Sequence, residues 1–122
     1  MHDDGTCQGL RNRWGTKASA RQTAAARIDA LGAAFNTAHN KVGQLKVDLE
    51  DAKNQLRLHP GDYSKRERVG EIEASLSVAQ GEQDAARTAK EQAQRELDSL
   101  TDELSELAAD LLTNCPQRYH PA

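Results

Sequence analysis

Two cysteines and two histidines near the chain ends are the residues best suited to covalent or metal chemistry. Cys7 and Cys115 are the only cysteines in the chain, and both lie outside its central helical pattern. We predict an intramolecular disulfide between them, which would indicate a periplasmic or secreted protein. Without this bond we would expect a cytoplasmic protein.

A zinc site is an alternative use of the same residues. His2 precedes Cys7 and His120 follows Cys115 at the same spacing, which gives a mirror-symmetric set of two cysteines and two histidines. Zinc binds such sets tetrahedrally, although the spacing here is wider than in the common zinc fingers. Two free thiols, or bridges between chains, remain further alternatives. Our leading interpretation includes no metal and no cofactor.

The other residues show no pattern typical of an enzyme. The sequence contains neither a glycine-rich phosphate-binding loop nor a Gly-x-Ser-x-Gly nucleophile elbow. His39 and His59 have no nucleophile spaced to meet them, and we interpret the many carboxylates as solvated helix faces. We therefore expect a non-enzymatic protein without catalytic residues.

Composition points to long helices rather than to a packed globular domain. Charged residues make up 29% of the 122 residues and aromatic residues only 3%. The net charge is −3 and no basic stripe is interleaved with aromatics, so we expect no nucleic-acid partner. No apolar run reaches the roughly 18 residues needed to cross a bilayer, so we expect no direct membrane insertion.

Apolar residues at alternating steps of three and four form two stripes, which we call the seams. The first seam contains Ile28, Leu31, Phe35, Ala38, Val42, Leu45, Leu49, Ala52 and Leu56. The second contains Val69, Ile72, Leu76, Ala79, Gln83, Ala86, Lys90, Ala93, Leu97, Leu100, Leu104, Leu107 and Leu111. Stripes this narrow are typical of coiled coils, in which each seam is buried against another helix.

Sequence breaks divide the chain into the predicted elements. These are an irregular segment 1–16, a helix 17–59, a turn 60–63, a helix 64–114 and a tail 115–122. Pro60 and Gly61 interrupt the helical pattern, and Ser64 with Glu67 forms a capping box for the second helix. The prediction is an all-α fold, a long antiparallel two-helix coiled-coil hairpin.

The seams favour one register. In this register the numbers of two facing residues add up to 121. Large side chains then often face small ones, as Val42 faces Ala79, and the acidic segment 96–110 lies beside the basic segment 11–27. In a rival register, shifted by one heptad, the numbers of two facing residues add up to 128. Gln83 and Lys90 are polar residues at seam positions, where they can specify the register and the oligomeric state. Alternatively, the aliphatic part of Lys90 lies along the seam and its ammonium group reaches solvent.

Alanine clustering predicts self-association. Residues 18–38 contain nine alanines, on more than one face, with further alanines expected opposite them. Because small side chains let helices approach closely, we expect the hairpin to self-associate into a four-helix bundle.

The turn and its flanks, residues 49–67, resemble the α-helical hairpin of periplasmic adaptor proteins of tripartite efflux and secretion systems. Gly61-Asp-Tyr-Ser64-Lys-Arg-Glu67 matches the tip pattern of that family, which docks on an outer-membrane channel. Lys53 and Arg57 stand where the family has arginine and leucine, and the second is a clear departure. We interpret the likeness as convergence among coiled-coil hairpins.

The sequence therefore predicts a structural or protein–protein interaction module whose partners are proteins, itself included. The alternative is a secreted effector, inhibitor or receptor-binding ligand that uses the hairpin face or the turn residues Pro60, Gly61, Asp62 and Tyr63. Tyr63 is the expected exposed anchor. Docking on a membrane channel is the third hypothesis.

Overall fold

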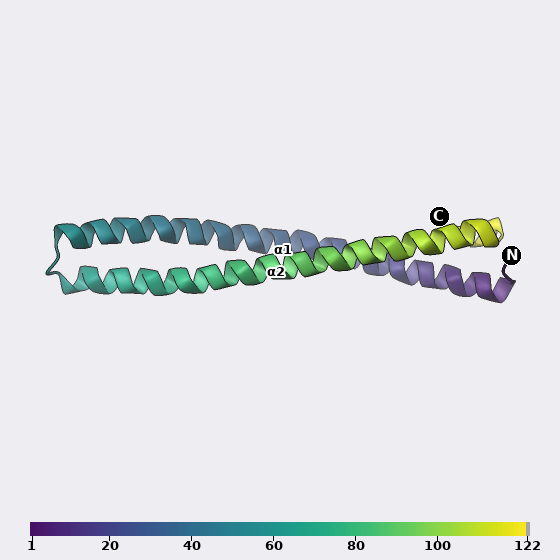
Figure 1. The fold of residues 1–122 in the computed structure, drawn as a ribbon, viewed down its shortest axis with the longest axis horizontal. Helices are drawn as coiled ribbons and strands as arrows, with labels where there is room; N and C mark the ends of the chain where they lie inside the picture. Colours follow the sequence, from purple (N-terminus) through teal and green to yellow (C-terminus); the bar gives the residue numbers. More distant parts are fainter. Residues whose placement is uncertain (122) are drawn as a thin grey trace. The chain divides into compact units, whose positions relative to one another are not determined.

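The computed structural model describes residues 1–121, and two long helices make up most of them. Helix α1 spans Asp4–Leu58, α2 spans Tyr63–Asn114, and the short 3₁₀ helix η1 spans Gln117–Tyr119. No strand occurs within these residues. The two long helices pack against each other in opposite directions, which confirms the predicted helical hairpin (Figure 1).

The hairpin consists of two compact units, each of which contains part of both helices. The turn unit comprises Ala30–Lys90, and the disulfide unit comprises Met1–Asp29 together with Glu91–Ala122. Ala122, the last residue of the predicted tail, lies outside the described residues. Both termini belong to the disulfide unit and lie at the same end of it (Figure 1).

Polar contacts between the helices identify the register in each unit. In the turn unit Lys41 Nζ lies 3.8 Å from Glu82 Oε2, and in the disulfide unit Lys17 Nζ lies 2.7 Å from Glu103 Oε2. The residue numbers of both pairs add up to within two of 121. The register is therefore the favoured one, because a total of 128 would leave these partners a full heptad apart.

Seam residues, joined in the disulfide unit by Ala24 and the two cysteines, form the buried interior of both units. The buried side chains of the turn unit are Val42, Val69, Ile72 and Ala79. Those of the disulfide unit are Cys7, Ala24, Ala93, Leu100, Leu111 and Cys115. No polar or charged residue among those described is buried. The interior of each helix pair is thus apolar, and its burial favours the pairing of the helices.

The predicted irregular segment 1–16 is wrong, because α1 already begins at Asp4. The Asp3 carboxylate accepts a hydrogen bond from the Thr6 backbone N–H at 2.7 Å and so satisfies a free donor at the helix start. Cys7, Leu10 and Trp14 continue the three–four spacing towards the N-terminus. All three pack in one apolar cluster, which compensates for the low helix propensity of the glycines in this segment.

The two helix ends at the turn each differ from the prediction by one residue. Helix α1 ends at Leu58 and α2 begins at Tyr63. The carboxylate of Asp62 accepts a hydrogen bond from the Lys65 backbone N–H at 3.3 Å, so Asp62 caps α2 in place of the predicted Ser64. The tail is not loose throughout, because Tyr119 of η1 packs on the apolar cluster.

Two adjacent leucines provide a direct test of this packing. Leu111 is completely buried, whereas Leu112 is 58% exposed. We expect Leu111→Ala to lower the free energy of unfolding by about 2–5 kcal/mol, because it leaves a cavity in the cluster. The control Leu112→Ala should change it by less than about 0.5 kcal/mol. Denaturant unfolding of the oxidised protein measures both, and equal losses would contradict the packing described.

Candidate functional site

The disulfide predicted from the sequence is present and buried. Cys7 and Cys115 are joined with an S–S distance of 2.08 Å and a Cα–Cα distance of 5.8 Å, across 108 positions of sequence. Their residues are 0% and 6% exposed, and with Leu111 they form the centre of an apolar cluster. Leu10 and Trp14 of α1 and Tyr119 of η1 cover this centre. Because solvent thiols have little access to the bond, its role in the structure is to hold the two chain ends together.

The zinc alternative is wrong, because the structure does not assemble its four residues as ligands. Both sulfur atoms are consumed by the disulfide. His2 Nε2 donates a hydrogen bond to Asp110 Oδ1 at 2.9 Å, and His120 Nε2 donates one to the backbone oxygen of Cys115 at 2.9 Å. Nowhere in residues 1–121 do three or more histidine, cysteine or acidic side chains group as metal ligands would.

Polar contacts around the disulfide tie the N-terminus to the end of α2. The His2 backbone N–H donates to the Asn114 carbonyl at 2.9 Å, and Arg118 Nη2 lies 2.6 Å from Asp4 Oδ1. The Arg118 guanidinium also lies over the Tyr119 ring, 5.0 Å from its centre. Hydrogen bonding to Tyr119, followed by the charge of Asp4, raises the pKa of Arg118. The arginine therefore stays charged and bridges the two termini.

Two carboxylates near the disulfide have lowered pKa values. The hydrogen bond from the Thr6 backbone N–H lowers the pKa of Asp3. Hydrogen bonds from the Asn114 side chain, at 2.7 Å, and then from His2 lower the pKa of Asp110. Both carboxylates are thus stabilised in their charged form at the helix ends.

The turn residues are exposed, as predicted for an interaction site. Tyr63 is 73% exposed, and Leu58 is 70% exposed. The Asp62 backbone N–H donates to the His59 carbonyl at 3.0 Å, and Arg66 Nη2 donates to the Pro60 carbonyl at 3.1 Å. These bonds fix the backbone of the turn, which is flanked by the exposed Leu58 at the end of α1 and Tyr63 at the start of α2.

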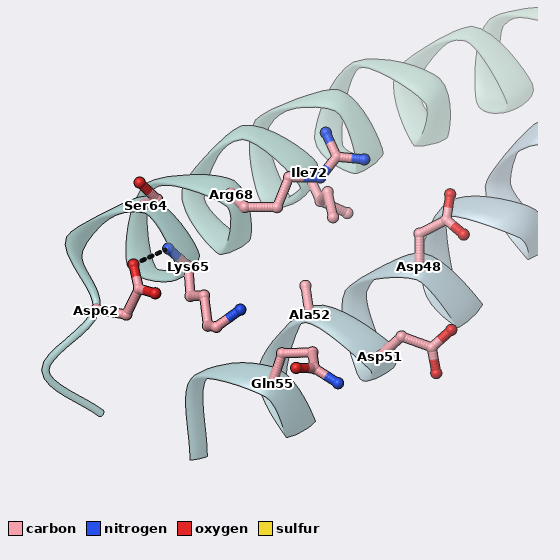
Figure 2. A pocket seen from close by; sticks show the side chains of 9 residues that line it. All are labelled: Asp48, Asp51, Ala52, Gln55, Asp62, Ser64, Lys65, Arg68 and Ile72. Atoms are coloured by element: carbon pink, nitrogen blue, oxygen red, sulfur yellow. Dashed lines mark hydrogen bonds between the residues drawn. The ribbon is translucent and has the colours of Figure 1, made fainter. Parts of the chain in front are cut away.

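A cleft of about 440 Å³ lies between the two helices next to the turn (Figure 2). Asp48, Asp51, Ala52 and Gln55 line it from α1, and Asp62, Ser64, Lys65, Arg68 and Ile72 line it from the turn and α2. The charged side chains of the α1 wall are therefore all acidic, whereas the other wall carries Lys65 and Arg68 together with Asp62. We did not predict this cleft, although the small Ala52 in the seam, and Lys65 one seam step before Val69, are sequence signals for it.

A second cleft, of about 420 Å³, lies in the disulfide unit. Its walls carry Leu10, Arg13, Lys17, Glu103, Glu106, Leu107 and Asp110. Here Lys17 on one wall pairs with Glu103 on the other at 2.7 Å, and Asp110 bonds His2 at 2.9 Å. Among residues 1–121, the cleft beside the turn has no such ion pair between its walls.

The two polar seam residues behave differently. The Gln83 side-chain amide donates to Nδ1 of His39 on the other helix at 2.8 Å, and the Phe35 ring stacks on His39. Lys90 is exposed, and its ammonium group lies near Gly32 of the other helix, where a side-chain Cβ would be 4.0 Å from Lys90 Nζ. Only Gln83 makes a specific bond across the seam, whereas Lys90 leads its ammonium out to solvent past Gly32.

As for membranes, none of the helices in residues 1–121 combines the length and the apolar character that a membrane span requires.

Removing the disulfide tests its structural role. We expect Cys7→Ser combined with Cys115→Ser to lower the free energy of unfolding by up to about 4.7 kcal/mol, the chain-entropy value for a loop of this size. Amide exchange should rise first in the disulfide unit, while the turn unit keeps its protection. Uniform loss of protection in both units would contradict a local role for the bond.

Acid should loosen the N-terminal turn of α1 through Asp3. Because folding lowers the pKa of Asp3, its stabilisation is complete above the ordinary aspartate pKa of about 3.9 and is lost as the pH falls through the lower folded value. The protection factors of the Thr6 and Cys7 amides, which correct for the intrinsic pH dependence of exchange, should therefore fall in acid. Asp3→Ala should lower these protection factors at neutral pH and remove their further fall in acid.

The matched control for this experiment is Asp29→Ala, on the same helix. Asp29 is exposed and has no side-chain hydrogen bond or ion pair within residues 1–121. Its replacement should leave exchange at Thr6 and Cys7 unchanged. If both variants behave alike, Asp3 does not cap the helix.

Comparisons with protein-family models, with curated proteins and with solved structures found no match to this chain. We therefore base the function on the chemistry of the two units described above.

Proposed function

We propose that this protein is a non-enzymatic interaction module outside the cytoplasm, a disulfide-clamped hairpin that presents its turn to a partner protein. The observation that carries the proposal is the exposure of Leu58 and Tyr63 on either side of a hydrogen-bonded turn. Large side chains held in solvent by a fixed backbone contribute strongly to protein interfaces, because little conformational entropy is lost when they bind.

The distribution of exposed apolar residues supports the turn unit as the binding part. Six large hydrophobic residues in the described part of the chain are strongly exposed, namely Met1, Val47, Leu58, Tyr63, Val78 and Leu112. Four of the six belong to the turn unit. The disulfide unit, in contrast, directs Leu10, Trp14 and Tyr119 onto its own cluster.

The interior also supports binding rather than catalysis. General acid–base catalysis depends on titratable groups whose surroundings tune their pKa, usually in a partly buried site. Within residues 1–121 the buried positions are all apolar. A binding role needs no such group.

A secreted ligand or inhibitor is the second candidate, and the exposure of Tyr63 favours it. Tyrosine combines a large apolar ring with a polar hydroxyl and is enriched where a protein contacts a receptor. Both candidates use the same turn, and they differ in whether the partner is a receptor on another cell or a component of the same assembly.

Self-association through the alanine-rich segment stays a prediction. Ala20, Ala26, Ala30, Ala33 and Ala34 are exposed on α1. Sedimentation at several protein concentrations measures this directly. We expect a concentration-dependent dimer that Ala26→Glu with Ala33→Glu disrupts, and a strict monomer would remove the four-helix bundle.

Photo-crosslinking tests the interaction function. A photoreactive phenylalanine analogue in place of Tyr63 should give one dominant adduct in cells that make this protein, and Leu58→Ala should reduce its yield. The same analogue in place of Leu112, which is also exposed but belongs to the disulfide unit, is the control. Equal adducts from both positions, or none from position 63, would contradict the proposal.

A further inference from the structure

The cleft beside the turn has an apolar floor and two oppositely charged walls. Ile72, which is 4% exposed, and the half-buried Ala52 provide the floor. Asp48 and Asp51 stand on α1, and Lys65 and Arg68 stand on α2. At the turn end of the cleft, Asp62 accepts a hydrogen bond from the Lys65 backbone N–H. Residues three apart lie on one helix face, so each wall presents a pair of like charges over a single turn.

The charges of the two walls do not neutralise each other. Among residues 1–121, no ion pair joins either aspartate to Lys65 or Arg68. Asp48 accepts a hydrogen bond from Gln44 on its own helix at 2.9 Å, and Arg68 Nη1 lies 3.8 Å from Glu71 with both side chains more than 60% exposed. In Figure 2 the Lys65 ammonium reaches into the space between the helices. The wall charges thus have partners only on their own helices, and among residues 1–121 no ion pair closes the cleft.

We propose that this cleft binds an amphipathic helix of a partner protein that carries basic side chains on one flank of a narrow apolar stripe and acidic side chains on the other. The proposal rests on the interaction function and names the partner's chemistry at that site. The basic flank would lie against Asp48 and Asp51, and the acidic flank against Lys65 and Arg68. The apolar stripe would cover Ala52 and Ile72.

A helix suits this cleft better than an extended segment does. A bound helix satisfies its own backbone hydrogen bonds, whereas an extended peptide needs partners along its length. Both walls are single helix turns with a pitch of about 5.4 Å, which a third helix matches when it packs lengthwise. Since exposed ion pairs are individually weak, we expect the wall charges to select the partner more than to increase its affinity.

Three synthetic helical peptides with the same leucine and alanine stripe test the proposal. The dipolar peptide has lysine on one flank and glutamate on the other, and the two comparison peptides have only lysine or only glutamate on both flanks. NMR titration of the oxidised full-length protein gives the binding site and the Kd. We expect the dipolar peptide to shift the Ala52 and Ile72 resonances and to bind about tenfold tighter than either comparison peptide.

Charge reversal provides the matched variants. Lys65→Glu with Arg68→Glu makes both walls acidic and should switch the preference to the all-lysine peptide. Lys46→Glu with Lys53→Glu makes the same change in net charge on exposed α1 positions of the same unit that do not line the cleft. This control should keep the preference for the dipolar peptide.

Several results would overturn the proposal. These are equal affinity for the three peptides, the absence of shifts at Ala52 and Ile72, or a switch of preference in the control variant. Shifts of the same resonances on raising the protein concentration alone would assign the cleft to a second copy of the chain and would also overturn it. If adducts from position 63 persist while no helix enters the cleft, this proposal fails and the interaction function stands; if both experiments fail, both are wrong.

Discussion

The physical constraint on which this protein depends is the burial of two narrow apolar stripes against each other in one register. Neither helix has a second apolar face wide enough to be buried elsewhere, and the buried residues are seam residues apart from Ala24 and the two cysteines. A shift by one heptad would displace one helix by about 10 Å along the other. Cys7 and Cys115, whose Cα atoms are 5.8 Å apart, would then lie beyond the roughly 7 Å at which a bridge can form. Pairing along the seam therefore places the cysteines, the turn and both clefts.

The two units share the same helix pairing but differ in the contacts that surround it. In the disulfide unit, the Lys17–Glu103 and Asp4–Arg118 ion pairs join the N-terminal and C-terminal parts of the chain, and aromatic side chains cover the disulfide. In the turn unit, Lys41 pairs with Glu82, but no ion pair among residues 1–121 crosses the cleft beside the turn, and the side chain of Tyr63 is exposed. This contrast supports a division between a part that stabilises the hairpin and a part that recognises a partner.

Much of the fold could be predicted from the sequence because the pairing of two helices depends on the spacing of apolar residues along each helix. The three–four spacing from Ile28 to Leu56, the Pro60-Gly61 break and the large–small pairing at a total of 121 predicted the helices, the reversal and the register. The start of α1 was missed because Lys17 and Arg21 interrupt the apolar stripe before it resumes at Trp14. Tertiary packing and the disulfide, which spacing alone does not reveal, keep that segment helical.

The cleft beside the turn could not be predicted in the same way. It arises where Ala52 is too small to fill the space between the helices and where Lys65 takes a position next to the seam. Such an opening depends on the relative placement of side chains from two helices, and a pattern within one helix does not report it. The same holds for Gln83 and Lys90, which occupy equivalent seam positions. Gln83 forms a hydrogen bond to the other helix, whereas Lys90 is exposed to solvent.

Zero-length crosslinking with a carbodiimide tests the register of the native, oxidised protein most directly. The structure predicts amide bonds between Lys17 and Glu103 in the disulfide unit and between Lys41 and Glu82 in the turn unit, at separations of 2.7 and 3.8 Å, when the monomer is digested and analysed by mass spectrometry. A dominant product joining Lys17 to Asp110, the acidic residue that the rival register brings beside it, would contradict the account.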